Sequence, residues 1–380
     1  MIFLARLLID SKELLMIKPL ECVKQIKPYV PGKPVKELER ELGISGCVKL
    51  ASNENPAGPS PKAVAAINDF LSQSSELCRY PDGSSYYLKQ ALSEKLSGRG
   101  LDLDPGNFIL GNGSNELLDI VARTYVGPGD EAVMATPSFV VYSMAVKAIG
   151  GVAREVGLTE YRHDLSAMAD AITTKTKIVF IANPNNPTGT INRKAEFDAF
   201  MKRVPDGVLV VIDEAYLEYA SDPEYPDTLH SYFAEGRDIL LLRTFSKAYG
   251  LAAMRIGYGI AKKEIIEDMN RLREPFNNNS LAQEAARAAL GDEAHLRNSI
   301  GINEEGKKYL YKELSALGLK YVPTEANFIY MPLDRDSNSL FDSLLKQGVI
   351  VRPVGPKEIR VTIGLDSENR RFIEALKKSL

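Results

Sequence analysis

The segment Arg243-Thr-Phe-Ser-Lys-Ala-Tyr-Gly-Leu-Ala-Ala-Met-Arg-Ile-Gly-Tyr258 follows directly on the apolar run Ile239-Leu-Leu-Leu242. The run predicts a buried strand, and the segment places Lys247 just beyond the carboxyl end of that strand. A lysine at the mouth of a buried strand is partly removed from water, which lowers its pKa and leaves the amine free to attack a carbonyl. The neighbouring hydroxyls and Arg255 are groups that bind a phosphate. The segment therefore predicts a reactive lysine beside an anion site, although a solvated lysine in a polar loop is the plainer alternative.

Short apolar runs alternate with helical patterns through the middle of the chain, which is typical of an α/β fold with a mostly parallel sheet. The runs expected to form strands are Glu131–Ala135, Lys177–Ala182, Val208–Ile212 and Asp238–Leu242. A further candidate, Arg255–Ala261, follows Leu242 too closely for a helical crossover, so we expect it to run antiparallel. Helices are expected at Pro61–Leu71, Tyr86–Leu96 and Glu116–Val126. Past about residue 275, strands mix with helices, which predicts a separate α+β lobe.

Composition limits the class of protein. Hydrophobic residues make up 44% and charged residues 26% of the 380 residues, as in ordinary globular proteins, and the net charge of −3 gives no reason to expect nucleic acid or an anionic membrane as partner. Three unclustered cysteines and three scattered histidines fit neither a disulfide framework nor a metal site, so we expect no metal and a reducing, cytoplasmic location. Residues 1–15 are expected to be an N-terminal extension, with Met16 as an alternative start.

Polar groups follow each expected strand, where ligands bind in open α/β sheets. Asn107–Leu110 leads into a glycine-rich turn with Ser114 and Asn115 at a helix start, which can hold an anion or can be an ordinary capped turn. Phe139 follows Glu131–Ala135 and can stack on a planar ring, although a lone aromatic is more often part of the core.

The next two strand ends carry an amide and a carboxylate. Asn186, in Asn183-Pro-Asn-Asn-Pro-Thr-Gly189, can bond a ring hydroxyl, or the motif can be a simple turn. Asp213 can hold a protonated pyridine nitrogen, with Tyr216 reaching the ring oxygen, or it can be a helix N-cap beside a packed tyrosine. Together with Lys247, these groups predict a site for pyridoxal phosphate.

These motifs resemble those of the pyridoxal-phosphate-dependent aminotransferases of the aspartate aminotransferase fold, class II, from about Ile17 to near the C-terminus. The resemblance implies a large domain with a mostly parallel seven-stranded sheet between helices, plus a smaller α+β domain. It divides the chain into an arm and part of the small domain at residues 16–50, a cofactor-binding domain at 51–275 and a small domain at 276–380.

The same resemblance assigns roles to the site residues. Lys247 would form the covalent link to the cofactor, Asp213 would pair with the pyridine nitrogen, and Tyr216 and Asn186 would contact the ring oxygen. The residues implied to hold the phosphate are Ser114, Asn115, Ser246 and Arg255, and Phe139 takes the stacking position.

Within this fold the chain is similar to the histidinol-phosphate aminotransferases. The matching segments are Ile26-Lys-Pro-Tyr-Val-Pro-Gly32, Leu50-Ala-Ser-Asn-Glu-Asn-Pro56, Arg79-Tyr-Pro-Asp82 and Gly348-Val-Ile-Val-Arg-Pro353. The resemblance implies a homodimer in which Tyr80 reaches the cofactor phosphate of the other subunit. It also implies that Arg360 and Arg352 bind substrate anions, while Asn327 and Tyr29 line the substrate side.

The implied reaction is amino exchange between L-histidinol phosphate and 2-oxoglutarate. Ala57 stands where this family often has an aromatic residue, which leaves the amino donor open. An aromatic amino acid aminotransferase and a lyase resembling threonine-phosphate decarboxylase share the same cofactor groups and remain alternatives. A pyridoxal-phosphate-binding transcription regulator would need a DNA-binding module before Ile17, for which we expect too few residues.

Overall fold

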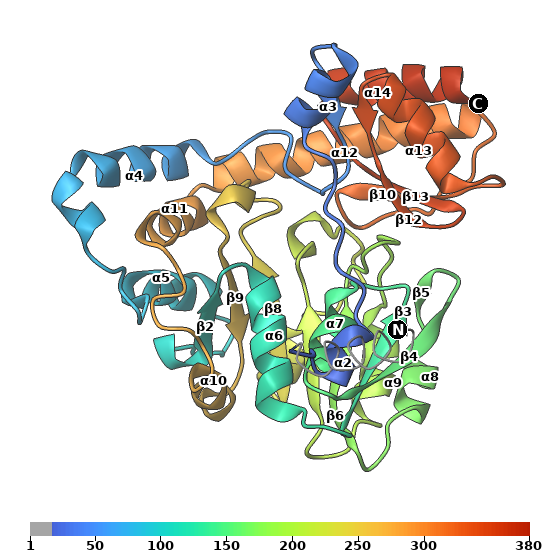
Figure 1. Ribbon diagram of the computed structural model, residues 1–380. Coiled ribbons are helices and arrows are strands. Elements are labelled where there is room, and N and C mark those ends of the chain that lie inside the picture. The colour runs from blue at the N-terminus through green and yellow to red at the C-terminus, as the bar shows by residue number, and fades with distance from the viewer. Residues whose placement is uncertain (1–16) are drawn as a thin grey trace, which may run out of the picture.

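A large sheet forms the centre of the protein in the computed structural model, which describes residues 17–380; the expected extension at residues 1–15 lies outside the described part (Figure 1). Its eight strands have the order β2-β9-β8-β7-β6-β3-β4-β5. The strands are β2 (Phe108–Gly111), β3 (Glu131–Thr136), β4 (Val152–Thr159), β5 (Arg162–His163), β6 (Thr176–Ala182), β7 (Leu209–Asp213), β8 (Ile239–Thr244) and β9 (Gly257–Ile260). The mostly parallel sheet is confirmed, but it has eight strands where seven were expected, because the two-residue β5 pairs with the edge strand β4.

The strand directions predicted from the sequence are confirmed for the strands with strong apolar runs. Strands β3, β6, β7 and β8 are parallel neighbours, and β9 runs antiparallel to both β8 and β2, as expected. Every residue of β7 and β8 is buried, which explains their unbroken apolar runs. Register pairs Asp213 with Leu242, so the segment that carries Lys247 begins beside Asp213 at the same edge of the sheet.

Helices cover both faces of this sheet. One core cluster joins the sheet to α6 (Ser114–Tyr125), α7 (Val141–Ala148) and α10 (Lys263–Asn270). A second cluster on the other face takes side chains from α4 (Pro61–Ser72), α5 (Tyr86–Leu96), α8 (Leu165–Asp170), α9 (Lys194–Met201) and α11 (Ser280–Leu290). The division of the chain at residue 276 stays a prediction, and α11, which follows it, packs against α4 and α5 on the large sheet (Figure 1).

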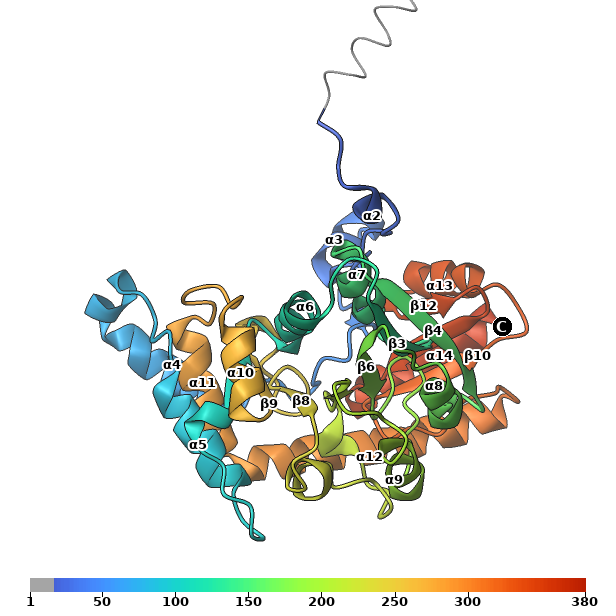
Figure 2. The ribbon, with the colours of Figure 1, turned by 90° about the horizontal axis from the view of Figure 1, so that it is seen from below.

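A smaller α+β unit has its own core. It contains the antiparallel sheet β10-β13-β12 and the parallel pair β1-β11. These strands are β1 (Val48–Lys49), β10 (Phe328–Pro332), β11 (Val349–Ile350), β12 (Arg352–Gly355) and β13 (Glu358–Thr362), and the helices beside them are α3 (Val35–Leu42), α13 (Ser337–Lys346) and α14 (Asp366–Ser379). The long helix α12 (Glu293–Ala316) runs from beside α11 to this unit, as both views show (Figures 1 and 2).

The remaining elements are short. They are α2 (Glu21–Lys24) and the one-to-two-turn helices at Ser74–Cys78, Pro105–Asn107, Leu217–Tyr219, Leu229–Phe233 and Ala252–Met254. Among residues 17–380, no helix is long and apolar enough to cross a membrane. Within the same range, no group of three or more His, Cys, Asp or Glu side chains is placed to hold a metal ion.

Candidate active site

A cavity of about 980 Å³ opens at the carboxyl ends of the parallel strands. Eleven of the predicted site residues line it, and they come from strand ends, helix starts, the arm and β13. They are Tyr29, Ser114, Asn115, Phe139, Asn186, Asp213, Tyr216, Ser246, Lys247, Arg255 and Arg360. Segments that are far apart in the sequence therefore supply one site, as the strand-end argument predicts.

Lys247 lies in the wall of this cavity, just after β8. Its Nζ donates a hydrogen bond to the Ser52 carbonyl oxygen at 3.2 Å and lies 5.7 Å from the centre of the Tyr216 ring. Burial lowers the pKa of Lys247 to about 8, and the positive charges of Arg360 and Arg255 act in the same direction. About half of the amine is therefore free at pH 8, far more than for an ordinary lysine, and a free amine is what attack on a carbonyl requires.

Asp213 ends β7 with its carboxylate held from two sides. Its Oδ1 accepts a hydrogen bond from the Ala215 backbone N–H at 3.1 Å, and its Oδ2 accepts one from the Tyr142 hydroxyl at 2.7 Å. Burial raises the pKa of Asp213, while these two hydrogen bonds and the Lys247 charge oppose that rise. A carboxylate so placed can bond the protonated nitrogen of a pyridine ring.

The glycine-rich turn before α6 forms an anion cradle. Gly113 precedes the helix with φ of +76°, and a Cβ there would lie 2.5 Å from Nη2 of Arg255. Only glycine therefore lets the guanidinium lie against this turn. Arg255 also donates to the Ser246 Oγ at 3.4 Å, so a cation, a hydroxyl and the free N–H groups of a helix start converge. These groups fit the phosphate of pyridoxal phosphate.

A second polar group in the cavity wall consists of Tyr216, Asn186 and Arg360. Arg360 donates to the Asn186 Oδ1 at 2.5 Å and to the Ala51 carbonyl oxygen at 2.7 Å. Its bond to the amide oxygen leaves the Asn186 amide N–H₂ free to donate to a ring oxygen. Burial raises the pKa of Tyr216, so its hydroxyl stays protonated.

Three predicted residues lie outside the cavity wall. Arg352 stacks on the ring of Tyr29 at 5.4 Å and is the register partner of Arg360, so the two arginines stand side by side on one face of the small sheet. Asn327 is buried and donates to the Asn53 carbonyl oxygen at 3.1 Å. Tyr80 is 81% exposed and stacks on Phe276, away from the cavity of its own chain.

Two side chains in the cavity wall were missed from the sequence. Tyr142 holds Asp213, and its only sequence signal is its place one helical turn after Phe139. Asn53 donates from Nδ2 to the Tyr216 hydroxyl at 2.8 Å. Its φ of +54° lies in the left-handed region, which asparagine tolerates, but only the structure reveals that conformation.

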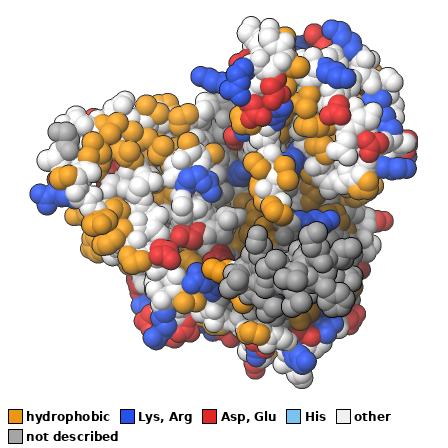
Figure 3. All heavy atoms as spheres, in the orientation of Figure 1, with side chains coloured by type: hydrophobic (Ala, Val, Ile, Leu, Met, Phe, Trp, Pro, Cys, Tyr) orange, Lys and Arg blue, Asp and Glu red, His pale blue; other side chains and the backbone are white. Residues whose placement is uncertain are grey.

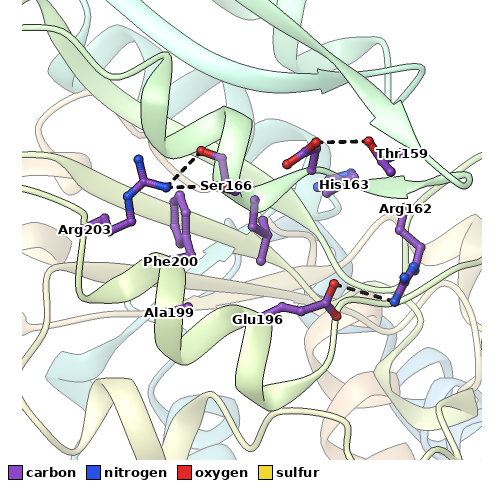
Figure 4. A pocket seen from close by; sticks show the side chains of 10 residues that line it. Thr159, Arg162, His163, Ser166, Glu196, Ala199, Phe200 and Arg203 are labelled. Atoms are coloured by element: carbon purple, nitrogen blue, oxygen red, sulfur yellow. Dashed lines mark hydrogen bonds and ion pairs between the residues drawn. The ribbon is translucent and has the colours of Figure 1, made fainter.

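A separate hollow of about 310 Å³ lies among β4, β5, α8 and α9 (Figure 4). None of the predicted residues lines it. Its arginines are already paired, Arg162 with Glu196 at 3.6 Å and Arg203 with Asp170. Charges that already have partners have little left for a ligand, so the large cavity is the candidate active site.

Comparison with known proteins agrees with this assignment. The family described as "Aminotransferase class I and II" matches residues 45–376. A protein of Moorella thermoacetica named histidinol-phosphate aminotransferase is 53% identical over 95% of this chain and 92% of its own.

Solved structures show the same fold. A histidinol-phosphate aminotransferase from Sinorhizobium meliloti, in complex with pyridoxal-5'-phosphate, has a TM-score of 0.86 at 27% identity over 96% of this chain and 98% of its own. A double mutant of Thermus thermophilus aspartate aminotransferase, at 24% identity, has a TM-score of 0.81 over 96% of this chain and 100% of its own. The expected fold class is thereby confirmed. The chain belongs to the class I and II aminotransferase family and, within it, to the histidinol-phosphate aminotransferases.

Proposed function

We propose that this chain binds pyridoxal phosphate and exchanges an amino group between L-histidinol phosphate and 2-oxoglutarate, in histidine biosynthesis. The observation that carries the proposal is one cavity whose wall contains Lys247, an anion cradle at Arg255 and a second, buried cation at Arg360, both of which act on the lysine charge. Three free cysteine thiols in a chain of this size favour the cytoplasm as the place of reaction.

The cofactor groups have complementary tasks. The phosphate would be held by Ser114, Ser246 and Arg255, the ring would stack on Phe139, and Asp213 would hold the protonated ring nitrogen. When bound, pyridoxal phosphate supplies an electron-withdrawing ring that takes up the charge left by removal of a proton from the substrate.

Lys247 then moves the proton. As a free amine, its Nζ would take the proton from the substrate Cα and, as an ammonium group, would give that proton back, so one group would serve as base and then as acid. Tyr216 and Asn186 orient the ring by hydrogen bonds to its oxygen. The two amino-exchange half-reactions share one site, so we expect ping-pong kinetics.

Arg360 accounts for the dual substrate choice. A guanidinium presents a planar fork that pairs equally well with a phosphate or a carboxylate. Burial lowers the pKa of Arg360, but an arginine stays charged throughout the working range, and its pairing with a bound anion would offset the burial of that charge. Histidinol phosphate and glutamate can thus use the same cation in turn.

A spectral titration of purified holoenzyme tests the reaction. Histidinol phosphate should convert the absorbance of the lysine-bound cofactor to that of pyridoxamine phosphate, and 2-oxoglutarate should restore it. Release of carbon dioxide from threonine phosphate would instead support the lyase, and preference for phenylalanine would support the aromatic aminotransferase. A Lys247→Ala variant that still turned over would contradict the role of the lysine.

We also propose a homodimer with shared active sites. Hydrophobic side chains gather on the left of the face in Figure 3, over α4 and α5. Large exposed apolar residues there are Val64, Leu71, Leu77, Tyr80, Tyr86, Tyr87 and Phe276. A patch of this kind favours a protein interface, and Tyr80 on it is free to extend into a partner.

Mixing two inactive variants tests the sharing. Lys247→Ala and Tyr80→Ala homodimers are each expected to be weak. After subunit exchange, half of the dimers are mixed, and one of the two sites in each mixed dimer has both residues, so activity should return to about a quarter of wild type. The control is the same mixing experiment with Lys247→Ala and Lys247→Met subunits. Neither kind of subunit supplies the lysine, so activity should not return. No recovery in the first mixture would overturn the shared site.

A further inference from the structure

Tyr142 is a side chain that hydrogen-bonds to the Asp213 carboxylate. It lies on α7, is 1% exposed, and donates its hydroxyl hydrogen bond to Oδ2 of Asp213 at 2.7 Å. The Ala215 N–H binds the other oxygen at 3.1 Å. With one donor on each oxygen, the plane of the carboxylate is fixed before any ligand arrives.

The ring of Tyr142 is itself held by two aromatic neighbours. It stacks on Phe180 with centroids 5.1 Å apart and planes 6° apart, and it meets Phe139 edge-on at 5.7 Å and 83°. This packing sets the direction of the hydroxyl. Tyr142 thus touches both Phe139, whose ring would lie on the cofactor, and Asp213, whose carboxylate would meet the ring nitrogen.

The Tyr142 hydroxyl also affects the protonation of Asp213. Burial raises the pKa of Asp213, and the hydrogen bond from Tyr142 is the strongest opposing influence, ahead of the Ala215 N–H and the Lys247 charge. Burial and the neighbouring carboxylate raise the pKa of Tyr142 well above its usual value, so the hydroxyl stays a donor. Without the Tyr142 hydroxyl, the buried Asp213 carboxylate would keep one direct hydrogen-bond donor, the Ala215 N–H, and would take up a proton more readily.

We propose that Tyr142 is a positioning residue that fixes the Asp213 carboxylate and the Phe139 ring for the cofactor, and that it acts on the reaction through them. The inference rests on the proposed binding of pyridoxal phosphate. It adds to that function a residue that contacts the two groups expected to hold the ring.

The affinity of apoenzyme for pyridoxamine phosphate measures this role directly. Pyridoxamine phosphate has no aldehyde for Lys247, so calorimetric titration reports the non-covalent contacts alone. Tyr142→Phe removes one oxygen and keeps the ring, and we expect its affinity to fall by about tenfold or more, as loss of a hydrogen bond to a charged group predicts. In an Asp213→Asn background, the same substitution should change the affinity by less than about twofold.

A matched control removes the same kind of bond elsewhere. Tyr232 is also buried and donates to a carboxylate, Oδ1 of Asp198, at 2.8 Å. Tyr232→Phe should leave the affinity for pyridoxamine phosphate unchanged, and thermal unfolding of each variant checks that it is folded.

Two results would overturn the inference: wild-type affinity in Tyr142→Phe, or an equal loss with and without the Asp213 carboxylate. Failure of the wild type to bind pyridoxamine phosphate would overturn the cofactor assignment together with this role. Tight binding without turnover of histidinol phosphate would overturn only the proposed substrate.

Discussion

The pKa of Lys247 can be tested through the charges that set it. Burial and the Arg360 charge bring this pKa from an ordinary 10.5 to about 8. At pH 8, an ordinary lysine has about 0.3% of its amine free, whereas Lys247 would have about half, a difference on the order of a hundredfold in reactive amine. The rate at which apoenzyme captures pyridoxal phosphate should therefore rise with pH and level off above a midpoint near 8.

Arg360→Gln should move that midpoint to higher pH. A nearby cation disfavours the protonated lysine, so its removal raises the pKa of Lys247. Arg360 is the strongest of the charges acting on the lysine, and we expect a shift on the order of one pH unit. Glu54→Gln should move the midpoint the opposite way, because the Glu54 charge raises the pKa of Lys247. Arg352→Gln removes an arginine that is not among the charges acting on the lysine, and it should leave the midpoint in place.

Stopped-flow absorbance from pH 6.5 to 10 gives the comparison, with rates fitted to a single ionisation for each variant. The ionisations of free pyridoxal phosphate are common to all variants, so differences between midpoints report the protein. A midpoint in Arg360→Gln that stays at the wild-type value, or moves down, would refute the electrostatic account of the lysine. Shifts of the same sign in Arg360→Gln and Glu54→Gln would refute it equally.

Other substitutions test the ring partner, the core and the lysine loop. Asp213→Ala should still bind some cofactor but slow transamination by about 100-fold or more, measured in single turnovers, since the ring nitrogen loses its counter-charge; near-normal rates would remove the role of Asp213. Leu241→Ala in the wholly buried strand β8 should lower the free energy of unfolding by about 2–5 kcal/mol in urea at fixed protein concentration. Gly250→Ala would place a Cβ 2.0 Å from the Gly58 carbonyl oxygen and should destabilise the fold and displace the Lys247 loop. Gly207→Ala has a similar positive φ but no atom within 4 Å, so it should cost only the backbone strain of about 1 kcal/mol in thermal or urea unfolding.

The buried half of the fold was predictable, and the partly exposed half was not. Strands β6, β7 and β8 carry continuous apolar runs, mostly of Val, Ile and Leu, because helices cover both of their faces. Strand β4 (Val152–Thr159) was missed because it lies near the edge of the sheet with exposed and half-buried residues mixed, so its composition does not differ from a loop. Its two-residue partner β5 is too short for any sequence pattern and forms only because β4 provides an edge for pairing.

The site residues likewise divide into those that could be predicted from the sequence and those that could not. Groups that directly follow a strand, such as Asp213 and Lys247, could be found because parallel strands end at a common edge. Tyr142 and Asn53 could not, since their contribution is a hydrogen bond to a residue that is distant in sequence. Such partners depend on how α7 and the segment around Asn53 pack in the fold, and tertiary packing leaves no local signal.

The charges around Lys247 couple its proton affinity to ligand binding. Arg360 and Arg255 both lower the pKa of the lysine, and both are placed to receive anions. An anion bound at either arginine offsets that positive charge, so it raises the pKa of the amine. The cofactor phosphate is expected at Arg255 in both steps, so the difference between them comes from Arg360. While Arg360 holds no substrate anion, the lysine is more readily free to attack the cofactor aldehyde. Once a substrate anion pairs with Arg360, the amine becomes a stronger base, which favours removal of the Cα proton, so Arg360 would suit one lysine to two successive tasks.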